Sequence, residues 1–149
     1  MRVDCALLCD AVTVRDGLLH ILGGGVTRLT RSEFPGPLGV ALALRVMVHP
    51  TEAQAPHTLR CVLLGQDGNE VAAVEAQFAL TGADGLLPGE ELSAPLQLPF
   101  ANAPLPAPGT YSFELLIDGV HQVSVPFTAV LAQQPHLPLG DGPDEFPSA

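Results

Sequence analysis

Apolar and polar residues alternate along most of this chain, and the clearest alternation lies between residues 109 and 127. Two runs with a period of two flank the dipeptide Asp118-Gly119. A period of two on both sides of a tight Asp-Gly turn predicts two antiparallel strands that share one buried face. The inward side chains predicted from this pattern are Tyr111, Phe113, Leu115, Ile117, Val123, Val125 and Phe127.

The same alternation predicts strands elsewhere in the chain, joined by further turns at Asp16-Gly17 and Asp67-Gly68. No stretch combines helical spacing of apolar residues with capping residues, so no helix is predicted. The expected fold class is all-β, a two-sheet antiparallel immunoglobulin-like sandwich of about eight strands. The other predicted strands cover residues 3–13, 18–22, 26–30, 38–49, 58–65, 71–80 and 92–100.

Glycines and prolines add detail to this prediction. The run Gly23-Gly24-Gly25 interrupts a strand pattern, as happens at a bulge, at a bend between sheets or at a close backbone approach. Pro95 and Pro99 predict that strand 92–100 lies at a sheet edge, and Pro126 predicts the same for the last strand. In the first strand, one face is expected to hold Val3, Cys5, Leu7, Cys9 and Ala11, and the other Leu8 and Val12.

The length of 149 residues and the apolar content of 47% suit one domain with a full core. We expect a β-sandwich domain over residues 1–130 and a disordered, acidic and proline-rich tail over residues 131–149. No apolar run approaches the roughly 20 residues that span a bilayer. Asp4 stands where a signal peptide would begin its apolar stretch, so a cytoplasmic location is expected.

The formal net charge is −10, and the charges are unevenly distributed. All six basic residues are arginines within residues 1–60, and residues 61–149 hold acids but no base. This balance argues against binding to nucleic acid or to anionic membranes, both of which require clustered cations. The asymmetry could support head-to-tail self-association, or it could simply reflect a solvated acidic surface.

One local motif resembles a known architecture. In Pro108-Gly-Thr-Tyr-Ser-Phe113 a tyrosine stands two residues before a core position, which resembles the corner entering a late strand of immunoglobulin-like domains. That core position is often cysteine and is Phe113 here, and the chain has no tryptophan. The resemblance is therefore to the sandwich architecture and not to an antibody-type domain.

Further motifs span about residues 1–130: Ala6-Leu-Leu-Cys-Asp10, the segment Asp16-Gly-Leu-Leu-His-Ile-Leu-Gly-Gly-Gly-Val-Thr-Arg28, Phe34-Pro, and the late Gly-x-Tyr-x-Phe followed by Asp-Gly. Together they resemble a family of small bacterial β-sandwich proteins of unknown function. The resemblance implies the fold and implies no catalytic residues.

Two histidines invite a reading as metal ligands. His49 and His57 flank a loop over residues 50–56 and could hold zinc together with Glu52, but the short spacing typical of zinc ligands is absent. The sequence therefore favours exposed loop histidines at both positions. His20 and His121 are predicted to be partly buried polar residues near strand ends.

Acids and cysteines give no site either. Asp4, Asp10 and Asp16 are candidate calcium ligands, a role that requires about six to eight oxygens that converge from loops at one end of the fold. Asp4 and Asp10 lie about 20 Å apart along one strand, so they cannot share an ion. The acids at 84, 90 and 91 lie in one loop and could bind cations only weakly. Cys5 and Cys9 lie about 13 Å apart and cannot bridge. With Cys61 they are predicted to be three reduced, buried thiols.

No catalytic, cofactor-binding or metal-binding residues are predicted. The glycine run lacks the following helix that a phosphate site needs, and its role stays open. The serines show no nucleophile motif with a base and an orienting group; they are Ser32, Ser93, Ser112, Ser124 and Ser148.

We therefore expect a non-enzymatic assembly or adaptor module that acts through protein–protein contacts, with a protein partner or a second copy of itself in a homo-oligomer. The alternative is a small-molecule or glycan-binding module, which one Tyr and no Trp support poorly.

Overall fold

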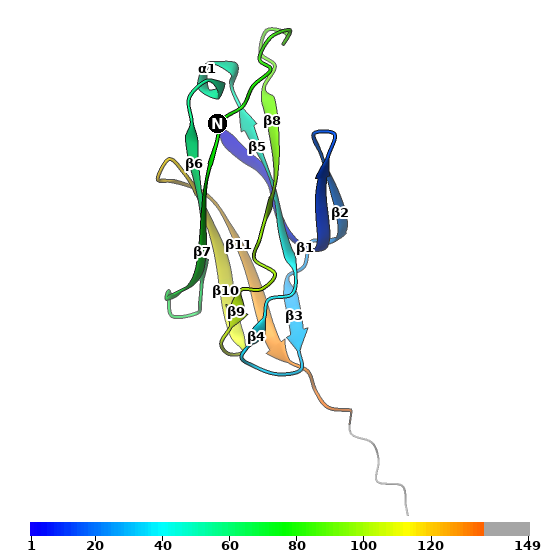
Figure 1. Cartoon of the computed structure of the whole chain (residues 1–149). Coiled ribbons are helices and arrows are strands. Elements are labelled where there is room, and N and C mark those ends of the chain that lie inside the picture. Colours follow the sequence, from blue (N-terminus) through cyan, green and yellow to red (C-terminus); the bar gives the residue numbers. More distant parts are fainter. Residues whose placement is uncertain (136–149) are drawn as a thin grey trace, which may run out of the picture.

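Four antiparallel strands form the first sheet of the computed structural model, which describes residues 1–135 (Figure 1). Their order across the sheet is β2-β1-β5-β8. The strands are β1 (Arg2–Arg15), β2 (Leu18–Gly24), β5 (Ala41–Val48) and β8 (Leu92–Leu98). β8 forms an edge of this sheet, which confirms the edge position predicted from Pro95.

Five strands form the second sheet, in the order β3-β11-β10-β6-β7. β3 pairs in parallel with the end of β11, and the other pairs are antiparallel. The strands are β3 (Arg28–Arg31), β6 (His57–Leu64), β7 (Glu70–Phe78), β10 (Gly109–Ile117) and β11 (Val120–Leu131). The alternating segments of the sequence thus become the strands of two sheets, as predicted.

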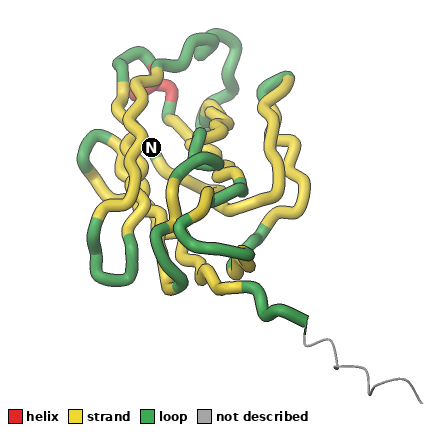
Figure 2. The backbone as a smooth tube through the Cα atoms, turned by 60° about the horizontal axis from the view of Figure 1, so that its bottom comes forward, coloured by secondary structure: helices red, strands yellow, loops and turns green. Residues whose placement is uncertain are grey.

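Two short strands and one short helix lie in segments that were expected to be loops (Figure 2). β4 (Gly36–Pro37) pairs with β9 (Pro104–Leu105), and α1 (Pro50–Ala53) follows β5. The prediction of no helix was wrong at α1, because a single turn is too short to show a helical period. Its signal is the cap: His49 Nδ1 accepts from Thr51 N–H at 3.3 Å, and Glu52 Oε2 accepts from His49 N–H at 3.4 Å.

The core lies between the two sheets and is built from their alternating apolar positions. β5 contributes Leu42, Leu44 and Val46, all fully buried. The ring of Phe113 on β10 lies 4.8 Å from that of Phe100, centroid to centroid, and 5.7 Å from that of Phe127 on β11. Side chains from both sheets therefore share one apolar interior, which is the source of the fold's stability.

The prediction that Pro126 marks an edge strand was wrong, because β11 lies between β3 and β10. Thr128 N–H donates to the Thr27 carbonyl, so the backbone nitrogen of Pro126, two residues earlier, faces the same side of β11. β3 begins at Arg28, opposite Thr128. Pro126 therefore lies beyond the start of β3, where an N–H group would have no strand to bond.

The faces expected for the first strand are also wrong in part. A register irregularity between Val3 and Cys5 in the pairing of β1 with β5 breaks the simple alternation. Val3 packs against the main core, and Leu8 is fully buried within it. Cys9 is buried instead in a second, smaller apolar cluster.

The run Gly23-Gly24-Gly25 carries the chain from the first sheet to the second. Gly25 N–H and Val26 N–H both donate to the Leu8 carbonyl, at 2.8 and 3.0 Å. Of the predicted alternatives for this run, a bend between sheets with a close backbone approach is confirmed. The expected boundary near residue 130 lies at the end of β11, and residues 136–149 of the expected tail lie outside the described residues.

Candidate functional site

The β1–β2 hairpin concentrates the exposed apolar side chains of the described residues. Figure 1 shows it on the side of the first sheet that faces away from the second sheet, and Figure 2 shows it standing apart from the body at its tip. The exposed fractions of its large apolar residues are 43% for Val14, 62% for Leu18, 37% for Ile21 and 70% for Leu22. Among residues 1–135 the other exposed large apolar residues are scattered singly, at Leu87, Val120 and Leu131.

Local sequence explains why this hairpin forms. Asp16 and Gly17 both have positive φ, 53° and 70°, which is the geometry of a two-residue turn between twisted strands. At the other end, Gly23 has φ of 62°, and a Cβ built there would lie 2.3 Å from Asp10 Oδ2. Only glycine fits this position without displacing the Asp10 side chain.

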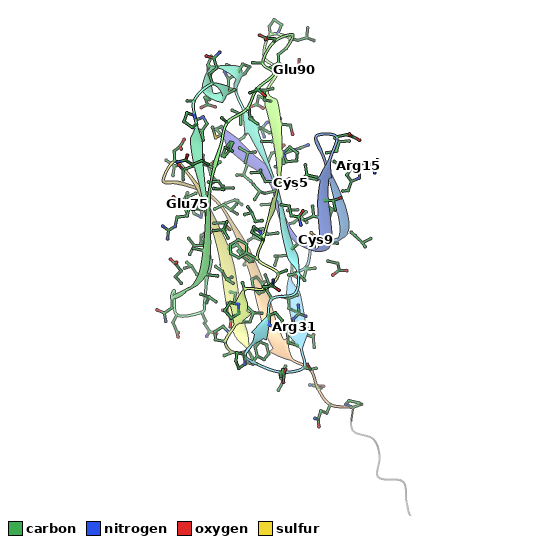
Figure 3. All side chains as sticks on the ribbon, in the orientation of Figure 1. Cys5, Cys9, Arg15, Arg31, Glu75 and Glu90 are labelled. Atoms are coloured by element: carbon green, nitrogen blue, oxygen red, sulfur yellow. The ribbon has the colours of Figure 1, made fainter. Side chains whose placement is uncertain are left out.

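One face of the hairpin is partly covered and the other is open. Val12 packs with Cys9 and Ala43 in the second apolar cluster, and Leu19 lies against it, so the hairpin covers part of the outer surface of the first sheet. Figure 3 shows Cys9 near the base of the hairpin and Arg15 near its tip. The opposite face is exposed throughout: Ala11, Thr13, Arg15, Leu18, His20 and Leu22.

The predicted partial burial of His20 is wrong for this reason, because His20 lies on the open face. The hairpin carries a shallow depression around Thr13, His20 and Leu22. Its lining is mainly apolar, with one hydroxyl and one imidazole. This depression can make apolar contacts and a few hydrogen bonds, and its lining contains no carboxylate and no arginine.

A second cluster, of Ser112, Glu114, His121 and Ser124, lies on the outer face of β10 and β11. Glu114 Oε2 lies 2.6 Å from His121 Nε2, and Ser112 Oγ donates to Glu114 Oε1 at 2.7 Å. Burial raises the pKa of Glu114, but hydrogen bonds from Ser124, Ser112 and His121 outweigh it and hold the pKa below its ordinary value. The cluster therefore stabilises a carboxylate.

The same cluster lacks the geometry of a serine hydrolase site. In such a site one imidazole nitrogen faces the serine and the other faces the acid. Here His121 Nε2 faces both, at 3.2 Å from Ser124 Oγ and 2.6 Å from Glu114, and Ser124 donates its proton directly to the carboxylate. His121 is exposed, so its predicted partial burial is wrong.

The two histidines considered as zinc ligands make contacts that hold local structure. His57 contacts the turn residue Asp118 and a backbone carbonyl, and His49 caps α1. His57 is not an exposed loop residue, since it begins β6 and its side chain is 13% exposed. Its Nδ1 lies 2.6 Å from Asp118 Oδ2 and its Nε2 lies 2.7 Å from the Glu52 carbonyl. His49, which is exposed as predicted, caps α1. Among residues 1–135 no group of three potential metal-ligating side chains gathers.

Three of the acids considered for cation binding, Asp4, Glu90 and Glu91, have partners within the chain. Asp4 forms a two-pronged ion pair with Arg45 at 2.9 and 2.7 Å, and this guanidinium lowers the pKa of the carboxyl group. Glu91 pairs with Arg2 at 2.8 Å, and Glu90 accepts from Leu87 N–H. Asp4 and Glu91 are thus paired with arginines, and Glu90 is bound to a backbone amide.

All three cysteines are free, as predicted, but only two are buried. Cys61 lies in the main core, where burial raises the pKa of its thiol to about 12, and burial also raises the pKa of Cys9. Cys5 is partly exposed. The two buried thiols stay protonated and behave as small apolar side chains.

The aromatic rings of the described residues lie in or against the core. Phe100, Tyr111, Phe113 and Phe127 are buried, and Phe34 and Phe78 are partly buried. A carbohydrate platform needs an exposed ring. In the described part of the chain, no helix has the length and apolar character required to cross a membrane.

Comparison with known proteins identifies the family but no activity. A search of curated proteins gave no match. A family model matches residues 4–130, which covers both sheets and the β1–β2 hairpin. The chain therefore belongs to DUF6941, a family of unknown function.

Proposed function

We propose that this protein is a non-enzymatic cytoplasmic binding module that acts by contacting another protein chain through its β1–β2 hairpin. The observation that carries the proposal is the pair of largely exposed leucines on the open face of the hairpin, Leu18 and Leu22. Val14 and Ile21 add exposed apolar surface on the other face. Apolar side chains that share one surface are a feature of protein contact sites, whereas singly exposed ones are ordinary.

We propose further that the sandwich is immunoglobulin-like. The order β11-β10-β6-β7 corresponds to strands G, F, C and C′ of a variable-type domain, and β1-β5-β8 corresponds to A, B and E. Tyr111 supports this assignment, because its hydroxyl donates to the Ala107 carbonyl at the entry to the strand assigned as F. Strand D has no counterpart among the described residues.

The non-enzymatic part of the proposal is supported by the Ser112–Glu114–His121–Ser124 cluster, the most enzyme-like group in the described residues. Its hydroxyls donate to a carboxylate, so neither is poised to lose its proton to an imidazole. A ligand-binding role gains no matching support, because the rings that would stack on a sugar or base lie in or against the core.

Affinity capture with two matched double variants tests the proposed contact surface. In the first, Leu18 and Leu22 become serine; in the control, Leu87 and Val120, with exposed fractions of 73% and 62%, become serine. All four side chains are exposed, so both variants should fold. We expect the wild type and the control to retain the same bound protein and the hairpin variant to lose it. Equal retention by all three proteins would contradict the proposal.

A further inference from the structure

We propose that the hairpin's partner is a second copy of this chain, joined by antiparallel pairing of the two β2 strands across a two-fold axis at His20. This inference rests on the proposed function, because it names the occupant of the same surface. The paired strands would join two four-stranded sheets into one sheet of eight.

β2 differs from the other edge strands of the two main sheets in lacking both charged residues and proline. Edge strands of monomeric proteins are commonly protected by charged side chains or proline. β8 contains Pro95, β7 contains Glu70 and Glu75, and the short β3 begins and ends with arginine. β2, Leu18–Gly24, contains neither a charged residue nor proline.

Hairpin geometry determines which backbone groups of β2 are available. Arg15 and Leu18 flank the two-residue turn, and in such a turn the N–H of the residue after it bonds back to the residue before it. The N–H of Leu18 therefore points toward β1. Because backbone directions alternate along a strand, Leu19 and Ile21 direct their N–H and C=O groups to the open side.

The sequence of β2 matches itself in the antiparallel direction. Leu18-Leu-His-Ile-Leu22 reads almost identically from either end. With His20 opposite the second His20, Leu18 of one copy faces Leu22 of the other, and Leu19 faces Ile21. A two-fold interface requires this kind of self-complementarity, because the same patch serves both copies.

Backbone and side chains favour the same register. When the pairing is centred on His20, the outward N–H and C=O groups of Leu19 in one copy face those of Ile21 in the other. A pairing centred on Ile21 would also bring outward N–H and C=O groups opposite each other. The His20-centred pairing places Leu18 of one copy opposite Leu22 of the other on the open face, whereas the Ile21-centred pairing places Leu18 opposite Gly24. The edge itself is uncharged, so the net charge of −10 on each chain does not act directly across the contact.

Cysteine cross-linking tests the register directly. In the proposed pairing two cysteines introduced at position 20 would face each other within disulfide range, whereas two introduced at position 22 would lie about 14 Å apart along the strands. Under mild oxidation, with Cys5 changed to serine in both proteins, we expect at least about tenfold more disulfide-linked dimer from His20→Cys than from Leu22→Cys. Mass spectrometry of the linked peptides should identify the bond at position 20. Equal or reversed yields would overturn the proposal.

Light scattering and analytical ultracentrifugation test the backbone contribution. Ile21→Pro removes an outward N–H without touching the bonds to β1, and Ile21→Ala removes side-chain atoms but keeps that N–H. Circular dichroism should confirm that both variants fold. We expect a wild-type dimer whose dissociation constant rises at least about tenfold more with proline than with alanine.

The outcomes separate this inference from the proposed function. A wild type that stays monomeric at several hundred micromolar overturns self-pairing, as does a dimer that both Ile21 variants leave intact. In either case the proposed function still stands if changing Leu18 and Leu22 to serine abolishes capture of a different protein. The proposed function fails, independently of self-pairing, if the variant with Leu18 and Leu22 changed to serine still retains the captured protein.

Discussion

The β1–β2 and β10–β11 hairpins use the same turn but occupy opposite environments. Asp16-Gly17 and Asp118-Gly119 adopt nearly the same backbone conformation, with φ of 53° and 70° in the first and 50° and 79° in the second. Both turns therefore direct the chain back on itself in the same way. Turn chemistry alone does not distinguish the two hairpins.

The difference lies in what surrounds each hairpin. β10 places Phe113 and Leu115 in the main core with no exposed surface, whereas β2 leaves Leu18 and Leu22 largely exposed. Asp118 is bound to β6 through Thr58 N–H at 2.9 Å, whereas the Asp16 side chain is 86% exposed. Local sequence thus specifies a hairpin, and the chain that enters or leaves it determines which layer it joins.

The largest expected effect is on the free energy of unfolding. Phe113→Ala should lower it by about 3–5 kcal/mol, because a buried ring that contacts two others leaves a cavity. Leu22→Ala on the exposed hairpin should change it by less than about 0.5 kcal/mol. Urea denaturation monitored by circular dichroism measures both changes. A comparable loss from Leu22→Ala would show that the hairpin belongs to the cooperative core.

A smaller effect should come from the glycine that bends the chain out of the hairpin. Gly23→Ala forces a side chain into a left-handed conformation and against Asp10, so we expect a loss of about 2 kcal/mol. Gly17→Ala is the matched control: its φ of 70° is similar, but a Cβ there meets nothing within 4 Å, so the loss should be about 1 kcal/mol.

Hydrogen exchange should localise the Gly23→Ala loss to the amides of β1 after Cys9 and to β2. Protection in β10 should be unchanged, because the main core does not depend on the bend. If β10 amides lose protection as much as those of β2, the two hairpins form one cooperative unit and the contrast between them fails.

The strands could be predicted from sequence because their information is local, and the errors arose where long-range contacts decide. Pro126 was misplaced because the short parallel strand β3 pairs only from Thr128 onward. Counting from the Asp118-Gly119 turn puts Glu114 opposite Val123, but a register shift in the hairpin puts it opposite Ser124. The Ser112–Glu114–His121–Ser124 cluster was therefore missed, although the turn gave an approximate register.

The candidate site was only half predictable. The Asp16-Gly17 turn after an alternating segment identifies Leu18–Leu22 as the returning strand, and the absence of charge in it is visible in the sequence. That the strand lies on the outside of the first sheet depends on the bend at Gly23–Gly25 and on two bonds to the Leu8 carbonyl, which the sequence does not specify. A buried strand and an exposed edge strand can share the same apolar pattern.

A third prediction concerns the end of the β10–β11 hairpin opposite its turn. Tyr111→Phe keeps the stacked ring against Phe127, 5.4 Å between centroids, but removes the hydroxyl that bonds to the Ala107 carbonyl. We expect the free energy of unfolding to fall by about 1 kcal/mol. Thermal and urea denaturation measure this loss, and an unchanged stability would show that the hydroxyl does not hold this corner.

The smallest expected effect is a pH dependence that distinguishes the two turns. His57 Nδ1 faces the Asp118 carboxylate and its Nε2 faces the Glu52 carbonyl, two oxygens that only accept, so the doubly protonated ring is favoured. The Asp118 hydrogen bond, followed by that of Glu52, raises the pKa of His57 above 6.5. The His57 hydrogen bond likewise lowers the pKa of Asp118 below 3.8.

The signs of these shifts define a window of pH. A raised histidine pKa contributes stability that is fully present below pH 6.5 and is lost as the pH rises through the folded value. A lowered aspartate pKa contributes stability that is present above pH 3.8 and is lost as the pH falls through the folded value. The pair therefore stabilises most between about pH 4 and 6.5.

Asp118→Asn should therefore lower the pKa of His57, followed by NMR of the ring protons, and should reduce stability near pH 5.5 but not at pH 9. Asparagine tolerates the positive φ of this turn and can still accept from Thr58 N–H, so the charge is the main change. Asp16→Asn makes the same change in the exposed turn and should leave the pH dependence of stability unaltered. If both variants reduce the pH dependence of stability equally, the contacts of Asp118 with β6 do not account for the difference between the two hairpins. A general reduction of negative charge would then be the better explanation.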